Sequence, residues 1–229
     1  YYHAWHIPSD GRQNHPVYIG YCESEDGIDW EKPTLGLVEF NGSTANNIVM
    51  ATINGRGCHD LSVFKDTNPN AQQDAQYKAV GRGHNPTGLY GFKSSDGIHW
   101  TAYNGSKPVM TGHPFDTQNL AFWDPNIGKY RSYIRDFDNG RRDIMMATSD
   151  DFAHWTKRQF LKYPGSPAEQ LYTNQIKPYY RATHLLIGFP ARYVDRGWTD
   201  ATNRLPSLDL RQQRAKTHPR YGSAVTDGL

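Results

Sequence analysis

Hydrophobic and polar positions along the chain alternate in short runs and show almost no helical period. The sequence Asp-Pro-Asn-Ile-Gly at 124–128 is a hairpin signal that leads into an aromatic-rich run at 129–137, and 179–193 follows the same pattern. Only 201–217 favours a helix. Three short β-prone runs begin just after a carboxylate, in 58–66 (CHDLSVFKD), 115–124 (FDTQNLAFWD) and 169–179 (EQLYTNQIKPY). This pattern predicts an all-β fold with a short helical insert near 201–217.

A second repeat has the form S-x-D-[GF]-x-x-W. It occurs at 24–30 (SEDGIDW), 94–100 (SSDGIHW) and 149–155 (SDDFAHW). Asp-Gly is a strong turn dipeptide, and Ser and Asp side chains bind nearby backbone N–H groups and fix a tight turn. We therefore predict a structural turn whose Trp packs into a neighbouring layer.

The two repeats keep a nearly constant spacing. Asp60 lies 40 residues before Trp100, and Asp116 lies 39 before Trp155. A unit of roughly 50–55 residues with about four short strands is typical of a β-propeller blade. We predict a single partial five-bladed propeller domain over 1–229, with units at about 1–50, 58–105, 115–160 and 168–229.

The position 40 residues before Trp30 lies ahead of residue 1. We therefore expect the first unit to lack its opening strand, with 1–7 as its second strand, and the fourth unit to stop before its closing turn. About three and a half of five blades would then be present. A signal peptide is not observable in such a stretch.

Carboxylates open the predicted inner strands. The first strand of every propeller blade lines the central channel, so Asp60, Asp116 and Glu169 are expected to converge there. Clustered carboxylates repel one another, and at least one becomes harder to ionise, which suits glycosidic cleavage. We assign Glu169 as general acid because Pro167 and Tyr172 predict a less polar setting. Asp116 is the second carboxylate and the alternative acid.

Polar and aromatic residues near these acids suit a sugar. His59 is expected to be a hydrogen-bonding neighbour, and Tyr179, Tyr180 and Trp198 are further stacking faces. Asp66, Asp124 and Asp138 lie in turn-like settings and are predicted to be structural. The candidate substrate-binding residues are His59, Gln118, Asn119, Trp123, Tyr172, Thr173 and Asn174.

Composition excludes several classes. Aromatic residues make up 13% and charged residues 21%, which is a folded composition, and the net charge of +2 comes without a basic stripe for nucleic acid. No run approaches the roughly 18 apolar residues of a membrane span. Cys22 and Cys58 match no metal motif, and two thiols or one disulfide both stay open.

Several segments resemble those of the five-bladed β-propeller glycoside hydrolases, the superfamily of families 43, 32, 68 and 117. SEDGIDWEKP (24–33) and SSDGIHWTAY (94–103) are similar to its blade-ending segments, and HDLSVFKD (59–66) to its second-blade segment. EFNGSTANNIV (39–49), with the segments that follow Phe115 and Glu169, resembles a poorly characterised bacterial branch.

The resemblance implies a glycoside hydrolase for a plant or algal poly- or oligosaccharide. On the match of HDLSVFKD, it also implies that Asp60 is the acid that modulates pKa and orients the sugar hydroxyls. It also implies no required cofactor, a channel calcium as an option, and a periplasmic or extracellular bacterial location. Two departures stand out. The characterised families carry a catalytic Asp in the first blade's opening strand, which this chain lacks. They carry the acid Glu at the third blade, where this sequence has Asp116 and Gln118.

Two alternatives stay open beside the hydrolase. A non-catalytic carbohydrate-binding propeller predicts carboxylates that point apart or are neutralised by Arg135 or Arg192. A sialidase-type propeller needs an arginine triad, of which Arg56, Arg82 and Arg135 give no sign. Retaining and inverting chemistry both fit, since they differ in carboxyl separation, about 5–5.5 Å against about 6.5–9.5 Å. A carbohydrate is the expected partner in the first two cases, without nucleic acid.

Overall fold

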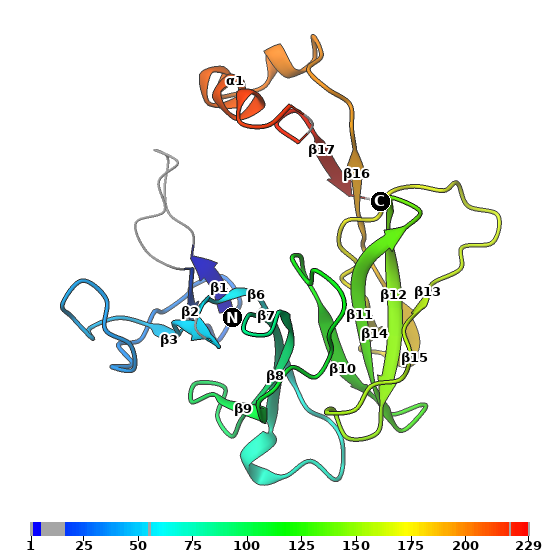
Figure 1. The fold of residues 1–229 in the computed structure, drawn as a ribbon. Coiled ribbons are helices and arrows are strands. Elements are labelled where there is room, and N and C mark those ends of the chain that lie inside the picture. The colour runs from blue at the N-terminus through cyan, green and yellow to red at the C-terminus, as the bar shows by residue number, and fades with distance from the viewer. Residues whose placement is uncertain (1, 6–16, 55, 220, 229) are drawn as a thin grey trace.

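The computed structural model describes residues 2–5, 17–54, 56–219 and 221–228. Antiparallel sheets dominate this part of the chain, and a single α-helix accompanies them (Figure 1). The prediction of an all-β fold is therefore confirmed. The number of blades in a closed ring stays a prediction.

Two four-stranded meanders form the centre of the molecule. We number them as the second and third sheets, because a smaller N-terminal sheet precedes them in the chain. The second sheet consists of β6 (His59–Lys65), β7 (Tyr77–Gly83), β8 (Gly88–Ser94) and β9 (Thr101–Ser106). The third sheet consists of β10 (Leu120–Asp124), β11 (Lys129–Asp138), β12 (Arg141–Ser149) and β13 (Gln159–Phe160). In both sheets each strand pairs with the next along the chain, which is the pattern of a propeller blade.

Smaller sheets flank the two meanders. The N-terminal ones are β1 (Tyr2–Trp5), β2 (Tyr18–Tyr21) and β3 (Ile48–Met50), and the ribbon of β4 (Thr52–Ile53) and β5 (Arg56–Gly57). The C-terminal ones are the pair β14 (Lys177–Tyr179) and β15 (Ala182–Ile187), and the pair β16 (Ala191–Val194) and β17 (Val225–Gly228). The predicted strand after Glu169 is replaced by an extended segment that hydrogen-bonds to β16, with Tyr172 N donating to Ala191 O at 2.7 Å.

The predicted helical insert is confirmed but shorter than expected. It projects between β16 and β17 (Figure 1) and contains a 3₁₀ turn, Thr202–Arg204, and the helix α1, Leu208–Lys216. Pro206 and Ser207 separate the two pieces, and Ser207 has a positive φ of 59° that interrupts any continuous helix. No helix among the described residues has both the length and the apolar character to cross a membrane.

The main core lies between the second and third sheets. Val80 and Leu89 from the second sheet meet Ile134 and Ala147 from the third, with Phe152 from the turn after β12 between them. A separate apolar cluster covers the other face of the third sheet and consists of Phe122, Tyr133, Ile144 and Leu171. Since successive strand residues point to opposite faces, covering both faces buries consecutive residues in the middle of each strand, 132–135 in β11 and 142–145 in β12.

The three repeated turns share one hydrogen-bond pattern. In 94–100, Gly97 N donates to Ser94 Oγ at 2.9 Å, and Asp96 Oδ1 accepts from the next two backbone N–H groups at 2.8 and 2.9 Å. Trp100 Nε1 closes the turn on Gly97 O at 3.1 Å. The same bonds recur in 24–30. In 149–155 the bonds of the Asp and the Trp recur, while Ser149 Oγ accepts from Asp151 N at 3.3 Å. The structural role of the repeat is confirmed, and Trp30 is its most exposed Trp at 48%.

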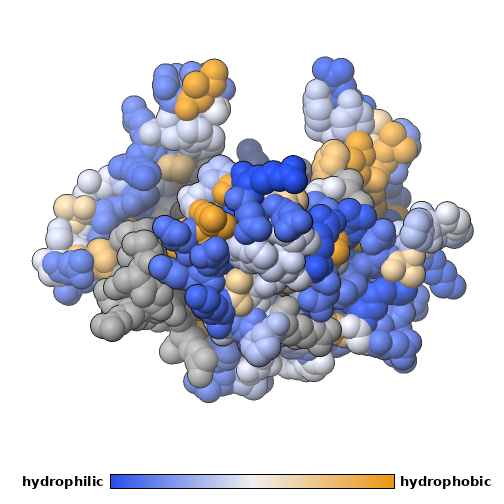
Figure 2. All heavy atoms as spheres, turned by 90° about the horizontal axis from the view of Figure 1, so that it is seen from above, coloured by the Kyte–Doolittle hydropathy of each residue, from blue (hydrophilic) through white to orange (hydrophobic). Residues whose placement is uncertain are grey.

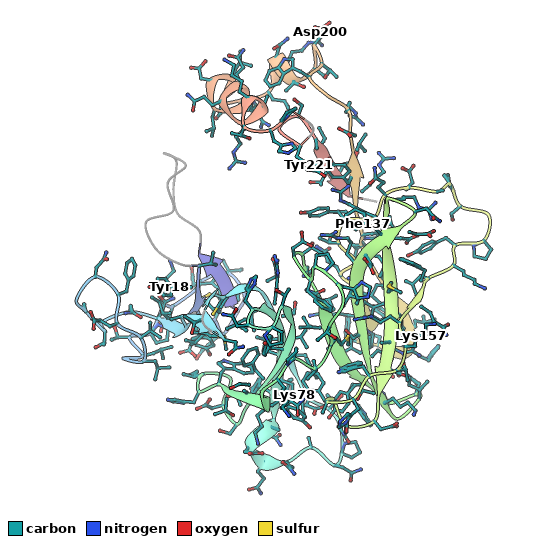
Figure 3. The ribbon with its side chains drawn as sticks, viewed as in Figure 1. Tyr18, Lys78, Phe137, Lys157, Asp200 and Tyr221 are labelled. Atoms are coloured by element: carbon teal, nitrogen blue, oxygen red, sulfur yellow. The ribbon has the colours of Figure 1, made fainter. Side chains whose placement is uncertain are left out.

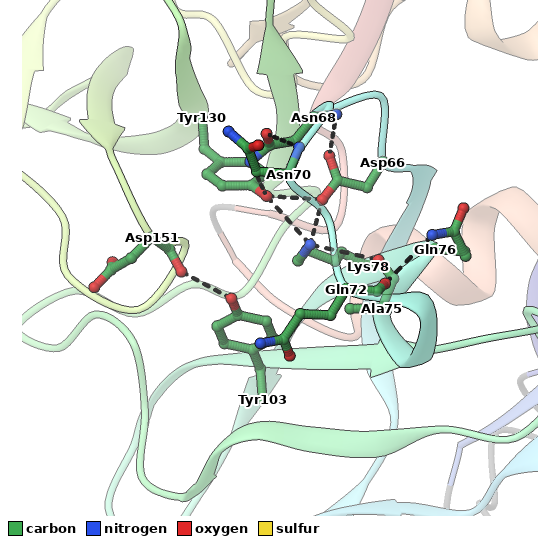
Figure 4. A network of polar contacts seen from close by, with 10 residues as sticks. All are labelled: Asp66, Asn68, Asn70, Gln72, Ala75, Gln76, Lys78, Tyr103, Tyr130 and Asp151. Atoms are coloured by element: carbon green, nitrogen blue, oxygen red, sulfur yellow. Dashed lines mark hydrogen bonds and ion pairs between the residues drawn. The ribbon is translucent and has the colours of Figure 1, made fainter.

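Buried polar contacts join the second sheet to the third. Asp66 contacts the Lys78 ammonium and accepts from Tyr130 Oη at 2.7 Å (Figure 4). Asp124 accepts from Arg131 Nε at 2.5 Å in the β10–β11 turn. Both acids therefore have the structural roles predicted for them.

The two cysteines are thiols, which excludes the alternative of a disulfide between them. Cys58 is fully buried among apolar neighbours, and Cys22 is partly exposed.

Candidate functional site

The loop that carries Asp116 is fixed by its own buried residues. Phe115 is inserted into the core with a positive φ of 48°. Asn119, also fully buried, donates its amide to Phe115 O at 3.1 Å and Thr117 O at 2.7 Å. The Asp116 side chain, 43% exposed, extends from this loop and accepts from Arg135 Nη2 at 2.5 Å.

Arg135 belongs to a row of side chains on one face of the third sheet. Residues 133, 135 and 137 of β11 point to the same face, and Arg142 of β12 is the cross-strand partner of Phe137. The Arg135 guanidinium carbon lies 4.9 Å from the Phe137 ring centre, and that of Arg142 lies 3.8 Å from the Tyr193 ring centre. Both arginines are more than nine-tenths buried.

The chain after Glu169 completes this arrangement. Tyr172 lies 5.7 Å from the Arg135 guanidinium and stacks on Tyr193 with the planes inclined by 24°. Arg142 Nη1 donates to Gln170 Oε1 at 3.0 Å. We call Arg135, Phe137, Arg142, Tyr172 and Tyr193 the arginine–aromatic site. Figure 3 shows Phe137 at this end of the third sheet, below Tyr221 of the C-terminal ribbon.

Glu169 lies at the edge of the arginine–aromatic site in a charged setting. Arg192 Nη1 donates to its Oε1 at 3.3 Å, while Arg192 Nε and Nη2 bind both oxygens of Asp227 at 2.9 Å. The hydrogen bond from Arg192 lowers the pKa of Asp227, and Asp227 followed by Glu169 raises the pKa of Arg192. The expected less polar environment of Glu169 is therefore not present, because Arg192 reaches it from β16.

Asp60 occupies a distorted part of β6. Its φ is 58°, and the pairing of β6 with β7 shifts register between His59 and Ser62. β6 lies against β10, so Asp60 and the Asp116 loop belong to neighbouring inner strands. The side chain of His59 lies outside the described residues, and its predicted role stays a prediction.

The remaining predicted binding residues divide by position. Gln118 belongs to the Asp116 loop, and Tyr172 belongs to the arginine–aromatic site. A hydrogen bond of 3.5 Å from Thr117 Oγ1 to Tyr172 O connects the loop to the site. Asn119, Thr173 and Asn174 bind backbone groups and support the fold around the site. Asn119 donates within its own loop, Thr173 Oγ1 accepts from Ala191 N of β16, and Asn174 bonds both Ile176 N and Tyr133 O of β11.

The aromatic candidates lie elsewhere. Trp123 lies at the far end of β10 from Asp116 and packs on Tyr130, 4.9 Å between ring centres. Tyr179 and Tyr180 form an edge-on pair at the β14–β15 turn. Trp198 donates to Asn203 within the insert. The structure does not bring these four residues to Asp116.

Arg142, Phe137 and Asp227 were missed by sequence reasoning. Residues two apart in a strand share a face, so the strand predicted at 129–137 already indicates that Arg135 and Phe137 lie side by side. The partners of Arg142 and Asp227 depend on pairing between distant segments. Among the described residues, no group of three His, Cys, Asp or Glu side chains is placed to hold a metal ion, and the channel calcium stays a prediction.

Figure 2 looks down on this end of the molecule and shows a mainly hydrophilic surface with small separate hydrophobic groups. Phe137 and Tyr221 contribute exposed aromatic surface here, with 42% and 49% of each residue accessible. Carboxylates, guanidinium groups and aromatic faces together suit a polyhydroxylated ligand, which offers hydroxyl groups and an apolar ring face.

Comparison with solved structures shows a likeness in fold at low sequence identity. The GH32 beta-fructofuranosidase of Bombyx mori matches with a TM-score of 0.50 at 16% identity, over 84% of this chain and 38% of that one. An E230A fructofuranosidase from Schwanniomyces occidentalis, complexed with fructosylnystose, matches with 0.53 at 14% identity, over 85% and 36%. An N-acetylgalactosamine deacetylase from F. plautii, complexed with blood group B trisaccharide, matches with 0.51 at 12% identity, over 93% and 63%.

The chain thus spans about four-tenths to two-thirds of the length of these structures. No protein-family model and no curated protein sequence matches it. At such identities the likeness concerns the fold, in agreement with the resemblance drawn from the repeated turns.

Proposed function

We propose that this chain is part of a carbohydrate-active propeller protein and binds a saccharide at the arginine–aromatic site. The propeller glycoside hydrolase fold supports a carbohydrate ligand. The exposed face of Phe137 and the ring of Tyr172 offer stacking surfaces, and Asp116 and Glu169 offer hydrogen-bond acceptors for hydroxyl groups.

One observation carries this proposal in preference to catalysis. Both candidate carboxylates contact a guanidinium, Asp116 with Arg135 at 2.5 Å and Glu169 with Arg192 at 3.3 Å. Each guanidinium therefore occupies a hydrogen-bonding position of its carboxylate, whereas a general acid must place its own proton on the leaving-group oxygen. These pairs match the arrangement expected of a non-catalytic carbohydrate-binding propeller.

Binding is tested with a panel of neutral oligosaccharides and two variants that remove an exposed phenyl ring. Phe137→Ala removes the stacking face of the site, and Phe189→Ala removes a ring that is 64% exposed in the connection between β15 and β16 and is not one of the five site residues. We expect Phe137→Ala to weaken binding about fivefold to tenfold, the range of one aromatic contact. The Phe189→Ala variant should bind like the unmodified protein. Absence of binding across the panel, or equal loss in both variants, would contradict the proposal.

Glycoside hydrolysis is the second candidate, for a plant or algal poly- or oligosaccharide. The fold supports it, and so does the exposure of the Asp116 and Glu169 side chains, 43% and 39%, which leaves both accessible to a substrate. Glu169 would be the general acid, Asp116 the second carboxylate and Asp60 the orienting acid. For this chemistry Glu169 must separate from Arg192 when the substrate binds.

The whole protein provides the test of catalysis. Glu169→Gln should reduce turnover at least about a hundredfold while saccharide binding survives. An unchanged rate in Glu169→Gln would eliminate this assignment and leave the binding function in place.

A further inference from the structure

A pocket of about 370 Å³ lies between the second and third sheets, apart from the arginine–aromatic site. Its walls come from the segment that joins the two sheets, from β12, and from the segment between β12 and β13. The lining residues are Val109, Met110, Thr111, His113, Met145 and Trp155, continuing through 156–158. This volume lies in the usual range of small-ligand pockets.

The pocket and the arginine–aromatic site use opposite faces of the third sheet. Met145 is paired with Ile134, and both point toward the second sheet, whereas Arg135 and Phe137 point away from it. In Figure 3, Lys157 lies well apart from Phe137. A ligand in this pocket is therefore a second ligand, independent of the proposed function.

The polar lining of the pocket is cationic. Lys157 is exposed and Arg158 is half-buried, and none of the lining residues is acidic. Arg158 Nη2 donates to Thr111 O at 2.8 Å, which orients the guanidinium and leaves further N–H donors in its planar fork. His113 contacts Asp136, whose side chain is only 16% exposed, so this carboxylate holds the imidazole in place. Its negative charge offsets part of the positive charge of Lys157 and Arg158.

The apolar part of the lining includes an oriented indole. Trp155 Nε1 is fixed on Phe152 O at 2.9 Å as part of the third repeated turn, and Met110 and Met145 lie beside it in the pocket. A ligand that fits must combine an anionic group with an apolar face. A pyranose ring that carries a carboxylate has both features, because its C–H face packs on aromatic rings and its carboxylate matches a guanidinium fork.

We propose that this pocket, between Trp155 and the Lys157–Arg158 pair, binds a uronic acid residue. The carboxylate contacts Arg158 with support from Lys157, and the sugar ring lies over the apolar wall.

NMR titration with methyl β-D-glucuronide and methyl β-D-glucoside tests the proposal, because the two probes differ only in the carboxylate. We expect saturable binding of the glucuronide that weakens with added salt, and binding of the glucoside at least about tenfold weaker. Arg158→Gln and Lys157→Gln should each weaken glucuronide binding. The exposed Lys177→Gln is the charge-matched control and should leave it unchanged.

Thermal melting of each variant establishes that it is folded. If Arg158→Gln unfolds, Lys157→Gln still tests the proposal, because Lys157 is exposed and its substitution leaves the core intact. Three results would overturn the proposal. The glucuronide could fail to bind, or inorganic sulfate could bind as tightly as the glucuronide, which indicates a simple anion site. Binding could also be lost in Phe137→Ala and retained in Lys157→Gln, which would place the acid at the arginine–aromatic site.

Discussion

The buried ion pair between the second and third sheets gives a quantitative test of how the two sheets are held together. The side chains of Lys78 and Asp66 are 2% and 0% exposed. Tyr130 Oη donates to Asp66 at 2.7 Å and lies 3.2 Å from Lys78 Nζ, and Asn68 N donates to Asp66 at 3.0 Å (Figure 4). Burial, together with the nearby Asp66 carboxylate, raises the pKa of Tyr130, so its hydroxyl stays protonated and remains a donor.

Lys78→Met should destabilise the protein by about 3–5 kcal/mol, because it leaves the Asp66 carboxylate buried without its cation. Methionine keeps most of the aliphatic length, so little packing is lost. For a domain of this size the loss corresponds to a fall in Tm of about 10 °C. Lys93→Met is the matched control. Its partner Asp74 lies at 2.5 Å but is 61% exposed, and the expected cost is below about 1 kcal/mol.

Urea denaturation of the single and double variants separates the interaction energy of the Lys78–Asp66 pair from the other effects of each substitution. Because Lys78→Met combined with Asp66→Asn removes both charges, the double variant should be more stable than the sum of the two single losses predicts, by about 2–3 kcal/mol. Additive losses, or a cost for Lys78→Met no larger than for Lys93→Met, would refute the view that a buried ion pair joins the sheets.

Two further predictions concern groups whose pKa departs from its ordinary value. Burial by itself raises the pKa of Asp151, but hydrogen bonds from the His154 ring, from two backbone N–H groups and from Ser149 outweigh it and lower the pKa to about 2. Since the pKa of Asp in the unfolded chain is about 3.9, the stabilisation of the folded state by ionised Asp151 is complete above about pH 4. It is lost as the pH falls toward about 2. The difference in Tm between the unmodified protein and Asp151→Asn should therefore shrink over this window, and a difference that grows on acidification would be inconsistent with it. Burial raises the pKa of Cys58 to about 12, so iodoacetamide at pH 8 should leave Cys58 unmodified in the folded protein and label it in urea, as read by peptide mass spectrometry. Rapid labelling of Cys58 without denaturant, or a peptide cross-linked to Cys22, would contradict its buried thiol state.

The repeated turns and the meander sheets could be predicted from the sequence because short-range contacts decide them. In 94–100 every bond that fixes the turn joins residues at most three apart, from Ser94 and Asp96 to the backbone that follows. The same locality explains why 149–155 forms the turn although Phe152 replaces the glycine. Phe152 takes the positive φ of 67° and is compensated by complete burial in the core.

The surroundings of the candidate carboxylates could not be predicted, because they depend on pairing between distant segments. Asp116 and Arg135 are 19 residues apart and meet only because the Asp116 loop reaches the C-terminal half of β11. Glu169 meets Arg192 because its segment pairs with β16 and not with a strand of its own. A sequence pattern gives the spacing of such acids, but their ionisation depends on the cation that the fold brings beside them.

The alternation of β11 makes the two proposed sites separable in one experiment. Arg135 and Asp136 are adjacent in sequence, yet Arg135 supports the arginine–aromatic site while Asp136 holds His113 at the pocket on the opposite face. Because the core and the paired strands lie between them, Phe137→Ala and Arg158→Gln share no contact partner. Their effects on the binding of a neutral oligosaccharide and of a glucuronide should therefore be independent, and in the double variant additive within about 0.5 kcal/mol. Strong coupling between them would mean that a single ligand spans both faces or that the third sheet changes as a unit when either site is occupied.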